Sequence, residues 1–377
     1  MYLVLFLFIL IIILGILENY VHQKHILNIP LRILVNGTRG KTSVTKMLVE
    51  VLNENGIKTM GKTSGSQPNY IYPDGKVEIQ KRKHKARIIE TIPFFTKASS
   101  IKVECVVVED MALISENQKI YSQKLVKPTH LIITNSFVDH IAEIGSTTRE
   151  TVWTLSQSII NNCQLFVCED YYNSFKCKLH QVNKEFSKEE IEEIKLKLKP
   201  SLIDLHINNV LLVLSLCKTL NIEEKSVLEA ISKTSGDIGL LKCYELKNKA
   251  EAYFNFSIND LHSMQENLNR EELKKYEKII IIFNNRKERE YRIITMKKLI
   301  LNNKSKIEKV YCIGDYPRKV QRYLLNKTKI PCEAITIQDL NKIMNEKSNE
   351  VAFVCLGNII GAGIALIESF GLGNRGN

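Results

Sequence analysis

The stretch that most constrains this chain is "ILVNGTRGKTSVTKMLVEVLNENG", residues 33–56. It begins with branched aliphatic residues, and such a short run is typical of a strand buried on both faces of a parallel sheet. Apolar residues then recur at helical spacing, and Gly56 follows where a left-handed residue would end the helix. The order is therefore strand, glycine loop and helix. The apolar positions of the helix are Val44, Met47, Leu48, Val51 and Leu52.

The glycine loop has the chemistry of a phosphate-binding site. A helix that starts here presents unpaired backbone N–H groups and the positive end of its dipole. Lys41 adds a full positive charge, and Thr42 offers a hydroxyl to a phosphate-bound Mg²⁺. The full Walker pattern requires glycine at position 35, where this chain has valine, so the alternative is an ordinary strand–helix turn that happens to contain glycines. The expected nucleotide-binding residues of the loop are Gly37, Thr38, Arg39, Gly40, Lys41, Thr42 and Ser43.

Length and composition set the frame for this loop. A chain of 377 residues with 44% hydrophobic residues is long enough for two domains with buried cores. The nine cysteines include no CxxC pair, which is typical of reduced thiols in a cytosolic protein. A formal net charge of +12 favours an anionic partner. The densest basic run, residues 81–87, has no aromatic side chains for stacking on bases, so a solvated loop is favoured there over nucleic-acid binding.

The N-terminal segment "MYLVLFLFILIIILGIL" has no charged side chain before Glu18. As a helix it spans about 26 Å, slightly less than a hydrocarbon core of about 30 Å, and Tyr20 with flanking polar residues would cover the difference. A cleaved signal peptide is the alternative, but the segment lacks a basic start and a small-residue cleavage site. We therefore expect a single-pass membrane anchor over residues 1–20. Basic residues begin only at Lys24, which predicts that the remaining domains lie in the cytoplasm.

Two further apolar runs, "VECVVVED" and "HLIITN", predict buried strands that end near Glu109 and Asn135. Ligands of open parallel sheets lie beyond the carboxyl ends of the strands, so we expect both residues to share a crevice with Lys41. His140 follows the second of these runs after a few residues, and Asp139 is beside it. A lone histidine is usually structural, but this position favours a site residue.

The rest of the chain indicates a second α/β domain. A charged helix up to Pro200 and a buried helix in "DLHINNVLLVLSLCKTLNI" are expected before glycines from Ser235 that favour a hinge. Beyond the hinge, apolar runs alternate with helical patterns such as residues 261–276, which implies a smaller parallel sheet. Asn259 and Asp260 follow the first of its strands. The four predicted strands are "EAYFNFS", "KIIIIFN", "KVYCIGD" and "VAFVCLGN".

A set of short sequences occurs in the order, and near the spacing, of the Mur-type ATP-dependent amide ligases. The set comprises "NGTRGKTS", "VVEDMA", "TNSFVDH", the helix of Asn209, "FSIND", "FNNRKER" and "LGNIIG". Together with one anchor helix, it most resembles the ligase subunits of membrane-bound poly-γ-glutamate synthases, from the anchor to about Gly361. The resemblance implies an α/β fold with a transmembrane anchor (1–20), a P-loop-type, Mur-ligase-like ATP-binding domain (21–235) and a smaller Rossmann-like C-terminal domain (236–377).

The resemblance also implies roles for individual residues of the first domain. Lys41 and the surrounding amides would hold the β- and γ-phosphates, with Thr42 on Mg²⁺. Glu109 matches the acidic metal ligand of the family, and His140 matches its histidine at a second metal position. Lys41, Glu109 and His140 are therefore expected in catalysis.

Other matched positions lie outside this cluster. Asn209 matches a residue near the adenine, and Asp260, with Asn259 beside it, matches one that reaches the nucleotide from the C-terminal domain. Lys242, expected among the catalytic residues, stands where arginine is common, which keeps the charge but loses the bidentate guanidinium. Ala142 replaces the second acid of an expected "DHMD", and residues 85–95 match the family's acidic and glutamine-containing segment poorly.

The reaction implied by the resemblance is ATP-dependent ligation of a carboxylate to an amine, for capsule or secreted polymer synthesis. A carboxylate attacks the γ-phosphate to give an acyl phosphate and ADP, and an amine then displaces phosphate. ATP and Mg²⁺ are the implied cofactors, with glutamate and a poly-γ-glutamate chain as substrates. A multi-span membrane subunit is the implied partner, and nucleic acid is not expected. The alternatives are a membrane-tethered P-loop ATPase or transporter motor, and a scaffold subunit with weakened catalysis.

Overall fold

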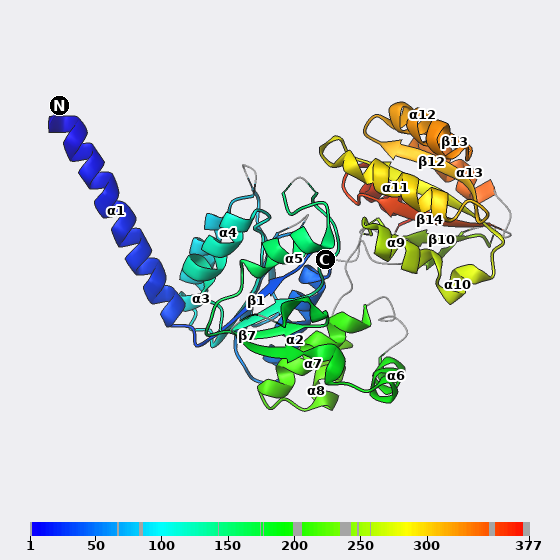
Figure 1. Ribbon diagram of the computed structural model, residues 1–377. Coiled ribbons are helices and arrows are strands. Elements are labelled where there is room, and N and C mark those ends of the chain that lie inside the picture. Colours follow the sequence, from blue (N-terminus) through cyan, green and yellow to red (C-terminus); the bar gives the residue numbers. More distant parts are fainter. Residues whose placement is uncertain are drawn as a thin grey trace. The chain divides into compact units, whose positions relative to one another are not determined.

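The computed structural model describes residues 2–65, 68–82, 86–141, 143–173, 175, 177–198, 206–233, 243–246, 249–256, 258–346 and 351–371. The chain divides into two compact units, residues 1–235 and 236–377. Each unit is a layered α/β structure with its own sheet (Figure 1), so the predicted fold class is confirmed. All nine cysteines lie within the described residues and are free thiols.

The first unit contains an eight-stranded sheet in the order β4-β3-β2-β5-β1-β6-β7-β8. The pairs from β2 to β8 along this order are parallel, whereas β3 and β4 form an antiparallel extension at one edge. Val35 of β1 pairs with Glu109 of β5 on one side and Ile132 of β6 on the other, so the loop after β1 begins between those two strands. The strands are β1 (Leu31–Asn36), β2 (Thr59–Lys62), β3 (Asn69–Ile71), β4 (Val77–Ile79), β5 (Cys105–Glu109), β6 (His130–Ile133), β7 (Gln164–Val167) and β8 (Lys178–Gln181).

Helices cover both faces of this sheet. The side of β1 that carries Ile33 and Val35 packs against α2, α7 and α8, whereas Leu34 packs against α3, α5 and the π-helix η2. Figure 1 shows α2, α7 and α8 on one side of the sheet and α3 and α5 on the other. The middle of β1, Ile33 to Val35, is covered on both faces, which explains why these three positions are aliphatic. The described helices after α1 are α2 (Lys41–Glu54), η1 (Ile88–Glu90), α3 (Thr91–Ser100), α4 (Ser115–Ile120), η2 (Tyr121–Val126), α5 (Thr148–Ser156), η3 (Asp170–Tyr172), η4 (Val182–Lys184), α6 (Lys188–Lys197), α7 (Ile207–Thr219) and α8 (Glu224–Ile231).

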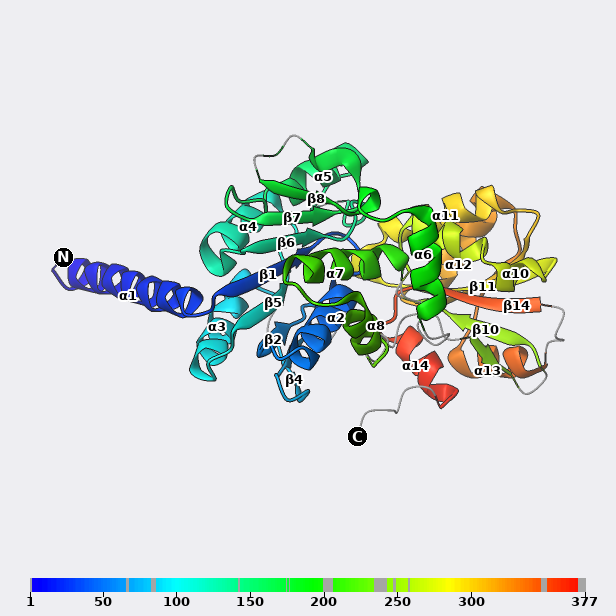
Figure 2. The same ribbon diagram turned by 90° about the horizontal axis from the view of Figure 1, so that it is seen from below.

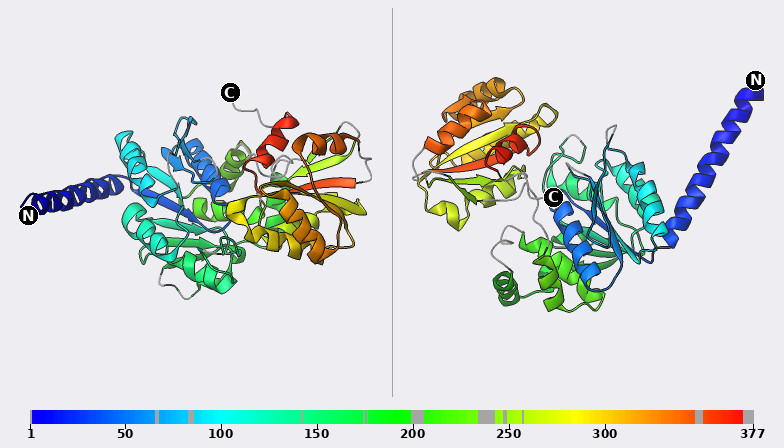
Figure 3. Two further views of the ribbon diagram at one scale, coloured as in Figure 1. Left: turned by 90° about the horizontal axis from the view of Figure 1, so that it is seen from above. Right: turned by 180° about the vertical axis from the view of Figure 1, so that it is seen from behind.

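The N-terminal helix α1 (Tyr2–Leu27) extends beyond the expected anchor of residues 1–20. By length and composition it could cross a membrane, and its apolar part is exposed. Its last turns pack on the first unit instead, because His22 and Ile26 are buried and His22 Nε2 lies 3.0 Å from the carbonyl oxygen of Leu125. Both views in Figure 3 show α1 as one unbroken helix. The helix that begins with the exposed apolar segment therefore ends in the core of the first unit, at Ile26.

The second unit contains a six-stranded sheet in the order β13-β12-β11-β14-β10-β9. Only β9 pairs antiparallel with its neighbour among these described strands. Helices α9, α11 and α12 pack on one face and α13 and α14 on the other, and Figure 2 shows α11 and α13 on opposite sides of the sheet. The elements are β9 (Cys243–Glu245), β10 (Glu251–Phe254), α9 (Leu261–Leu268), α10 (Glu271–Lys274), β11 (Lys278–Asn285), η6 (Lys287–Arg289), α11 (Tyr291–Asn302), β12 (Ile307–Gly314), α12 (Pro317–Thr328), β13 (Cys332–Ala334), α13 (Ile337–Glu346), β14 (Val351–Gly357) and α14 (Ala362–Ser369).

The four strands predicted for this unit are present as β10, β11, β12 and β14, and the helical pattern predicted over residues 261–276 is present as two helices. The pattern is divided into α9 and α10, because Asn269 ends α9 and Arg270 adopts extended backbone angles. The hinge predicted from Ser235 and the helix end at Pro200 lie outside the described residues.

Candidate active site

The loop between β1 and α2 makes two close approaches to its neighbours. At Gly37, where φ is +121°, an added Cβ would lie 2.1 Å from Thr134 Oγ1. At Gly40, where φ is +80°, an added Cβ would lie 2.6 Å from Asn209 Nδ2. Both glycines therefore meet a backbone angle and a spacing that other residues tolerate poorly.

The first turn of α2 is open to a ligand. No side chain caps this helix among the residues that the structure describes, so its first N–H groups are available to an anion. The ammonium of Lys41 lies back over the loop and donates a 2.7 Å hydrogen bond to the carbonyl oxygen of Gly37. A phosphate at the helix mouth would thus meet the amide dipoles and the lysine charge together.

Thr42 and Glu109 form a second part of the site. The hydroxyl of Thr42 donates to Glu109 Oε2 at 3.0 Å, and the N–H of Ser64 donates to the same oxygen at 2.8 Å. Glu109 is only 3% exposed, so its charge sits in a largely desolvated position. A hydroxyl and a carboxylate are oxygen ligands of the kind that Mg²⁺ prefers, and this ion usually completes its shell with water and phosphate oxygens. The donor set at this edge therefore fits Mg²⁺.

His140 contacts a different set of residues. Asp139 Oδ2 forms a 2.8 Å ion pair with Arg39 Nη2 and lies 3.8 Å from His140 Nε2. The backbone of His140 is left-handed, with φ of +52°, and its N–H donates to Asp139 Oδ1. Such strained backbone in a non-glycine residue is often found at functional sites. Within the described ranges, no three His, Cys, Asp or Glu side chains come together as a metal-binding group.

Asn135 and Asn209 both reach the loop. Asn135 Oδ1 accepts hydrogen bonds from Thr38 Oγ1 at 2.7 Å and from the N–H of Arg39 at 3.1 Å. Asn135 Nδ2 donates to the carbonyl oxygen of Arg39 at 3.0 Å, which fixes the loop to the end of β6. Asn209, at the start of α7, packs against Gly40 and is 6% exposed. The structure therefore brings together the loop, Glu109, Asn135 and Asn209 at the carboxyl edge of one sheet.

Asp110 is a buried acid at this edge that the sequence analysis did not select. It directly follows Glu109, and its Oδ1 accepts a 2.8 Å hydrogen bond from the N–H of Ala112. Burial raises the pKa of Asp110 to about 7, against the opposing effect of Lys41 and Lys62. Its position at the end of a predicted strand was the signal that could have identified it.

Lys62 is a second buried charge that the sequence analysis did not select. It is 2% exposed at the end of β2, and burial lowers its pKa to about 8, although Glu90 and Glu109 favour the charged form. A signal was available, because the sequence "GKTS" occurs twice, at residues 40–43 and 61–64. The first copy starts a helix, whereas the second puts its lysine at the end of a strand.

The remaining predicted residues belong to the second unit or are not described. Asp260 is 3% exposed and caps α9, since its side chain accepts a 2.8 Å hydrogen bond from the N–H of Ser263. Asn259 directly precedes it and is also buried. Lys242 and Ala142 lie outside the described residues.

Comparison with known proteins finds one family model and two relatives that are similar to this chain. A family model described as the poly-gamma-glutamate synthase CapB C-terminal domain matches residues 243–371. The capsule biosynthesis protein CapB of Bacillus anthracis is 27% identical over 263 residues, which cover 66% of this chain and 55% of that protein. The PGA synthase CapB of Bacillus subtilis (strain 168) is 27% identical over 267 residues, covering 67% of this chain and 66% of that protein. The matches thus span between about half and two thirds of these relatives.

Solved structures share the fold at low sequence identity. FolC of E. coli, in complex with DHPP and ADP, has a TM-score of 0.65 at 13% identity and covers 94% of this chain and 92% of its own. MurF from Acinetobacter baumannii has a TM-score of 0.64 at 13% identity, covering 94% of this chain and 78% of its own. The chain therefore shares its fold with FolC and MurF. The family model matches only the second unit, and the chain is similar to the two CapB proteins at 27% identity.

Proposed function

We propose that this protein is an ATP-dependent carboxylate–amine ligase that adds glutamate to a growing poly-γ-glutamate chain. The observation that carries the proposal is the Thr42–Glu109 pair beside the open first turn of α2 and the ammonium of Lys41. This arrangement suits a nucleoside triphosphate that carries a divalent cation. The substrate class comes from the CapB relatives, one of which is named as a PGA synthase.

In the proposed reaction, the chain's own groups position phosphate rather than attack it. Lys41 and the α2 amides would hold the β- and γ-phosphates, and Thr42 and Glu109 would hold Mg²⁺, which supplies charge neutralisation. A substrate carboxylate oxygen attacks the γ-phosphorus, and the bond from that phosphorus to ADP breaks. The amine nitrogen then attacks the acyl carbon, loses a proton, and inorganic phosphate departs with the former carboxylate oxygen.

Further roles are proposed for the residues around this centre. His140, held beside Asp139 and Arg39, is proposed for a second metal position. Asn209, packed on Gly40, is proposed to lie near the adenine. Asn259 and Asp260 are proposed to reach the nucleotide from the C-terminal unit, and Lys242 to assist catalysis as a cation.

The proposal extends to the cell membrane. An exposed, apolar and unbroken α1 supports a single-pass anchor, and the basic residues after it favour cytoplasmic catalytic units, where ATP is available. One helix has no room to export a polymer, so a multi-span membrane subunit is proposed as the partner that carries the chain outward.

The test is ADP release by the full-length protein, reconstituted with its membrane partner and supplied with ATP, Mg²⁺ and a panel of amino acids. The proposal predicts ADP release that depends on glutamate and on a poly-γ-glutamate acceptor. ADP release at the same rate without any amino acid would instead indicate an ATPase motor. Absence of nucleotide binding would indicate a scaffold.

A further inference from the structure

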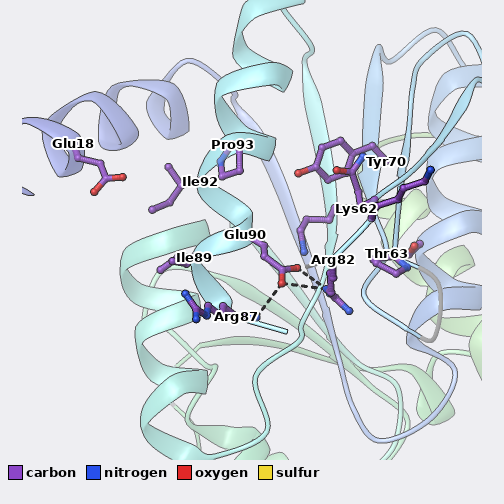
Figure 4. Close-up of a pocket in the computed structure, with 13 residues that line it drawn as sticks. Glu18, Lys62, Thr63, Tyr70, Arg82, Arg87, Ile89, Glu90, Ile92 and Pro93 are labelled. Atoms are coloured by element: carbon purple, nitrogen blue, oxygen red, sulfur yellow. Dashed lines mark hydrogen bonds and ion pairs between the residues drawn. The ribbon is translucent and has the colours of Figure 1, made fainter. Parts of the chain in front are cut away.

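A cavity of about 460 Å³ opens in the first unit, and its lining residues include Lys62 and Thr63 at β2. We refer to it as the β2 cavity. Its other walls come from Glu18 on α1, from Pro68 and Tyr70, and from residues before and within α3, namely Gln80, Lys81, Arg82, Arg87, Ile89, Glu90, Ile92 and Pro93. Figure 4 shows Lys62, Arg82 and Glu90 gathered in one part of the cavity, with Glu18 of α1 at another edge.

The β2 cavity carries a surplus of positive charge. Four basic side chains line it, from Lys62, Lys81, Arg82 and Arg87, against two acidic ones, from Glu18 and Glu90. Glu90 is already engaged, because Arg82 Nε donates to both of its oxygens, at 3.1 and 2.9 Å, and the N–H of Arg87 donates to it at 3.0 Å. Because Glu90 is occupied in this way, the lining as a whole keeps a net positive charge. That charge favours an anionic occupant.

Lys62 gives the cavity a buried cation without a strong acceptor. Its one hydrogen-bond partner within the described part of the chain is Met111 Sδ, at 3.6 Å. A thioether sulfur is a weak acceptor, and a buried charge is costly unless it is paired. A carboxylate that entered the cavity would supply the missing acceptor.

Hydrogen bonds through Ser64 link the lining of the β2 cavity to the predicted phosphate site. The carbonyl oxygen of Ser64 accepts a 3.4 Å hydrogen bond from Arg82 Nη1 in the cavity. The N–H of the same residue donates to Glu109 Oε2, which also accepts from Thr42. One residue therefore separates a cavity cation from the carboxylate expected to hold Mg²⁺.

We infer that the β2 cavity binds the carboxylate-bearing end of the poly-γ-glutamate acceptor, through Lys62, Arg82 and Arg87. The inference rests on the proposed function and adds to it the place where the acceptor lies. Successive carboxylates of the polymer match several cations in one cavity. The hydrogen bonds through Ser64 connect the cavity lining to Glu109, so the terminal carboxylate, the group that is to be phosphorylated, would lie on the side of the cavity that faces the phosphate-binding edge.

The test uses the full-length protein in nanodiscs of zwitterionic lipid, with a fluorescent γ-linked glutamate oligomer as the probe. Arg87→Gln removes an exposed cavity cation and leaves the core unchanged, and Lys62→Met removes the buried charge at similar length. Arg322→Gln on α12 is the matched control, because it also removes one exposed arginine charge but lies in the other unit. The control is needed because any polyanion is attracted to a chain of net charge +12.

We expect the affinity for the oligomer to fall about tenfold in Arg87→Gln and in Lys62→Met, because each variant loses one charge-assisted hydrogen bond. In Arg322→Gln the affinity should fall less than about twofold. Affinity for a fluorescent ATP analogue should stay unchanged in Arg87→Gln. An oligomer whose free α-carboxyls are amidated should bind weakly to the wild type.

The opposite results overturn the inference in distinguishable ways. Equal oligomer affinity in Arg87→Gln and Arg322→Gln, with glutamate-dependent ADP release intact, rejects the cavity while the proposed function stands. Displacement of the oligomer by nanodiscs that contain phosphatidylglycerol would assign the cavity to a lipid headgroup. A wild type that neither binds the oligomer nor releases ADP with glutamate rejects both proposals.

Discussion

The two sheets end differently at their carboxyl edges. In the first unit, polar side chains at the ends of β5 and β6 and in the loop after β1 lie beside the open first turn of α2. In the second unit, polar side chains at the ends of β11 and β14 are hydrogen-bonded to one another and to nearby backbone. Asn284 Nδ2 donates to the carbonyl oxygen of Ile360 at 3.1 Å, Asn358 Nδ2 donates to that of Asn284 at 3.3 Å, and the buried Arg292 donates to Asn358 Oδ1.

The glycines show the same contrast. Gly37 and Gly40 in the first unit allow the loop to approach Thr134 and Asn209 closely, beside a helix start that has no side-chain cap. Gly357 in the second unit, with φ of +108°, makes room for backbone, since an added Cβ would lie 2.4 Å from the carbonyl oxygen of Asn284. Polar residues at strand ends thus build a ligand site in one sheet and a structural network in the other.

Lys41→Ala gives the sharpest test of this contrast. Turnover of ATP should fall at least about 1000-fold, because the charge that stabilises the transferring phosphate is lost. The free energy of unfolding should change by less than about 1 kcal/mol, since one partly exposed hydrogen bond is removed. ADP release and chemical denaturation would measure the two effects, with the exposed Lys76→Ala as control. Turnover at the wild-type rate in Lys41→Ala would show that the loop after β1 is not the phosphate-binding site.

Asn358→Ala should give the reverse pattern in the second unit. The substitution leaves the buried guanidinium of Arg292 without its Asn358 partner, so the free energy of unfolding should drop by about 2–4 kcal/mol. Denaturant titration would measure it, beside Arg322→Ala on the exposed side of α12. A stability loss no larger than in that control would show that the network is not structural.

The pH dependence of acceptor use should separate Lys62 from Lys41. Burial lowers the pKa of Lys62 to about 8. The nearby carboxylates of Glu90, Glu109 and Asp110 act against this lowering, whereas the positive charge of Arg82 adds to it. Its ammonium therefore loses its proton as pH rises through about 8, and KM for the glutamate oligomer should rise several-fold between about pH 7 and 9. This rise should be absent in Lys62→Met. A rise of the same size in that variant would assign the titration to another group.

The amino end of the first sheet provides the smallest expected effect. Burial lowers the pKa of His130 to about 4, and its ring stacks on Phe166. The unfolded chain binds a proton near pH 6.5 and the folded chain does not, so stability should fall as pH drops from about 6.5 towards 4. His130→Gln should reduce this fall by on the order of 1 kcal/mol in denaturation at several pH values. The exposed His262→Gln serves as control, and an unchanged pH slope in His130→Gln would contradict the assignment.

Local sequence was sufficient for the parts of the fold that have a strong period. The aliphatic runs of β1, β5, β11 and β14 and the helical stripe of α2 each specify their element without knowledge of the rest. The open loop followed from Gly37 to Ser43, because glycine, lysine and hydroxyl residues at a helix start have few other uses. Val35 in place of the Walker glycine did not prevent this geometry.

Other features depend on contacts between distant segments. Strands β2, β3 and β4 have only three or four residues each, too few for a clear period, so the β2 cavity could not be predicted. The burial of Lys62 arises from packing between β2 and segments far along the chain. The left-handed backbone of His140 and the network around Asn358 also arise from tertiary contacts, which no pattern in one sequence records.

The central claim is that the open edge of the first sheet activates a carboxylate as its acyl phosphate. The most direct measurement supplies the reconstituted full-length protein with ATP, Mg²⁺ and an acceptor oligomer whose carboxyls carry oxygen-18. A ligase of this type must transfer one labelled oxygen to the released inorganic phosphate, because the carboxylate oxygen leaves bound to phosphorus when the amine attacks. The account predicts labelled phosphate in step with glutamate addition, and no label with Lys41→Ala. Glutamate addition with unlabelled phosphate would contradict it.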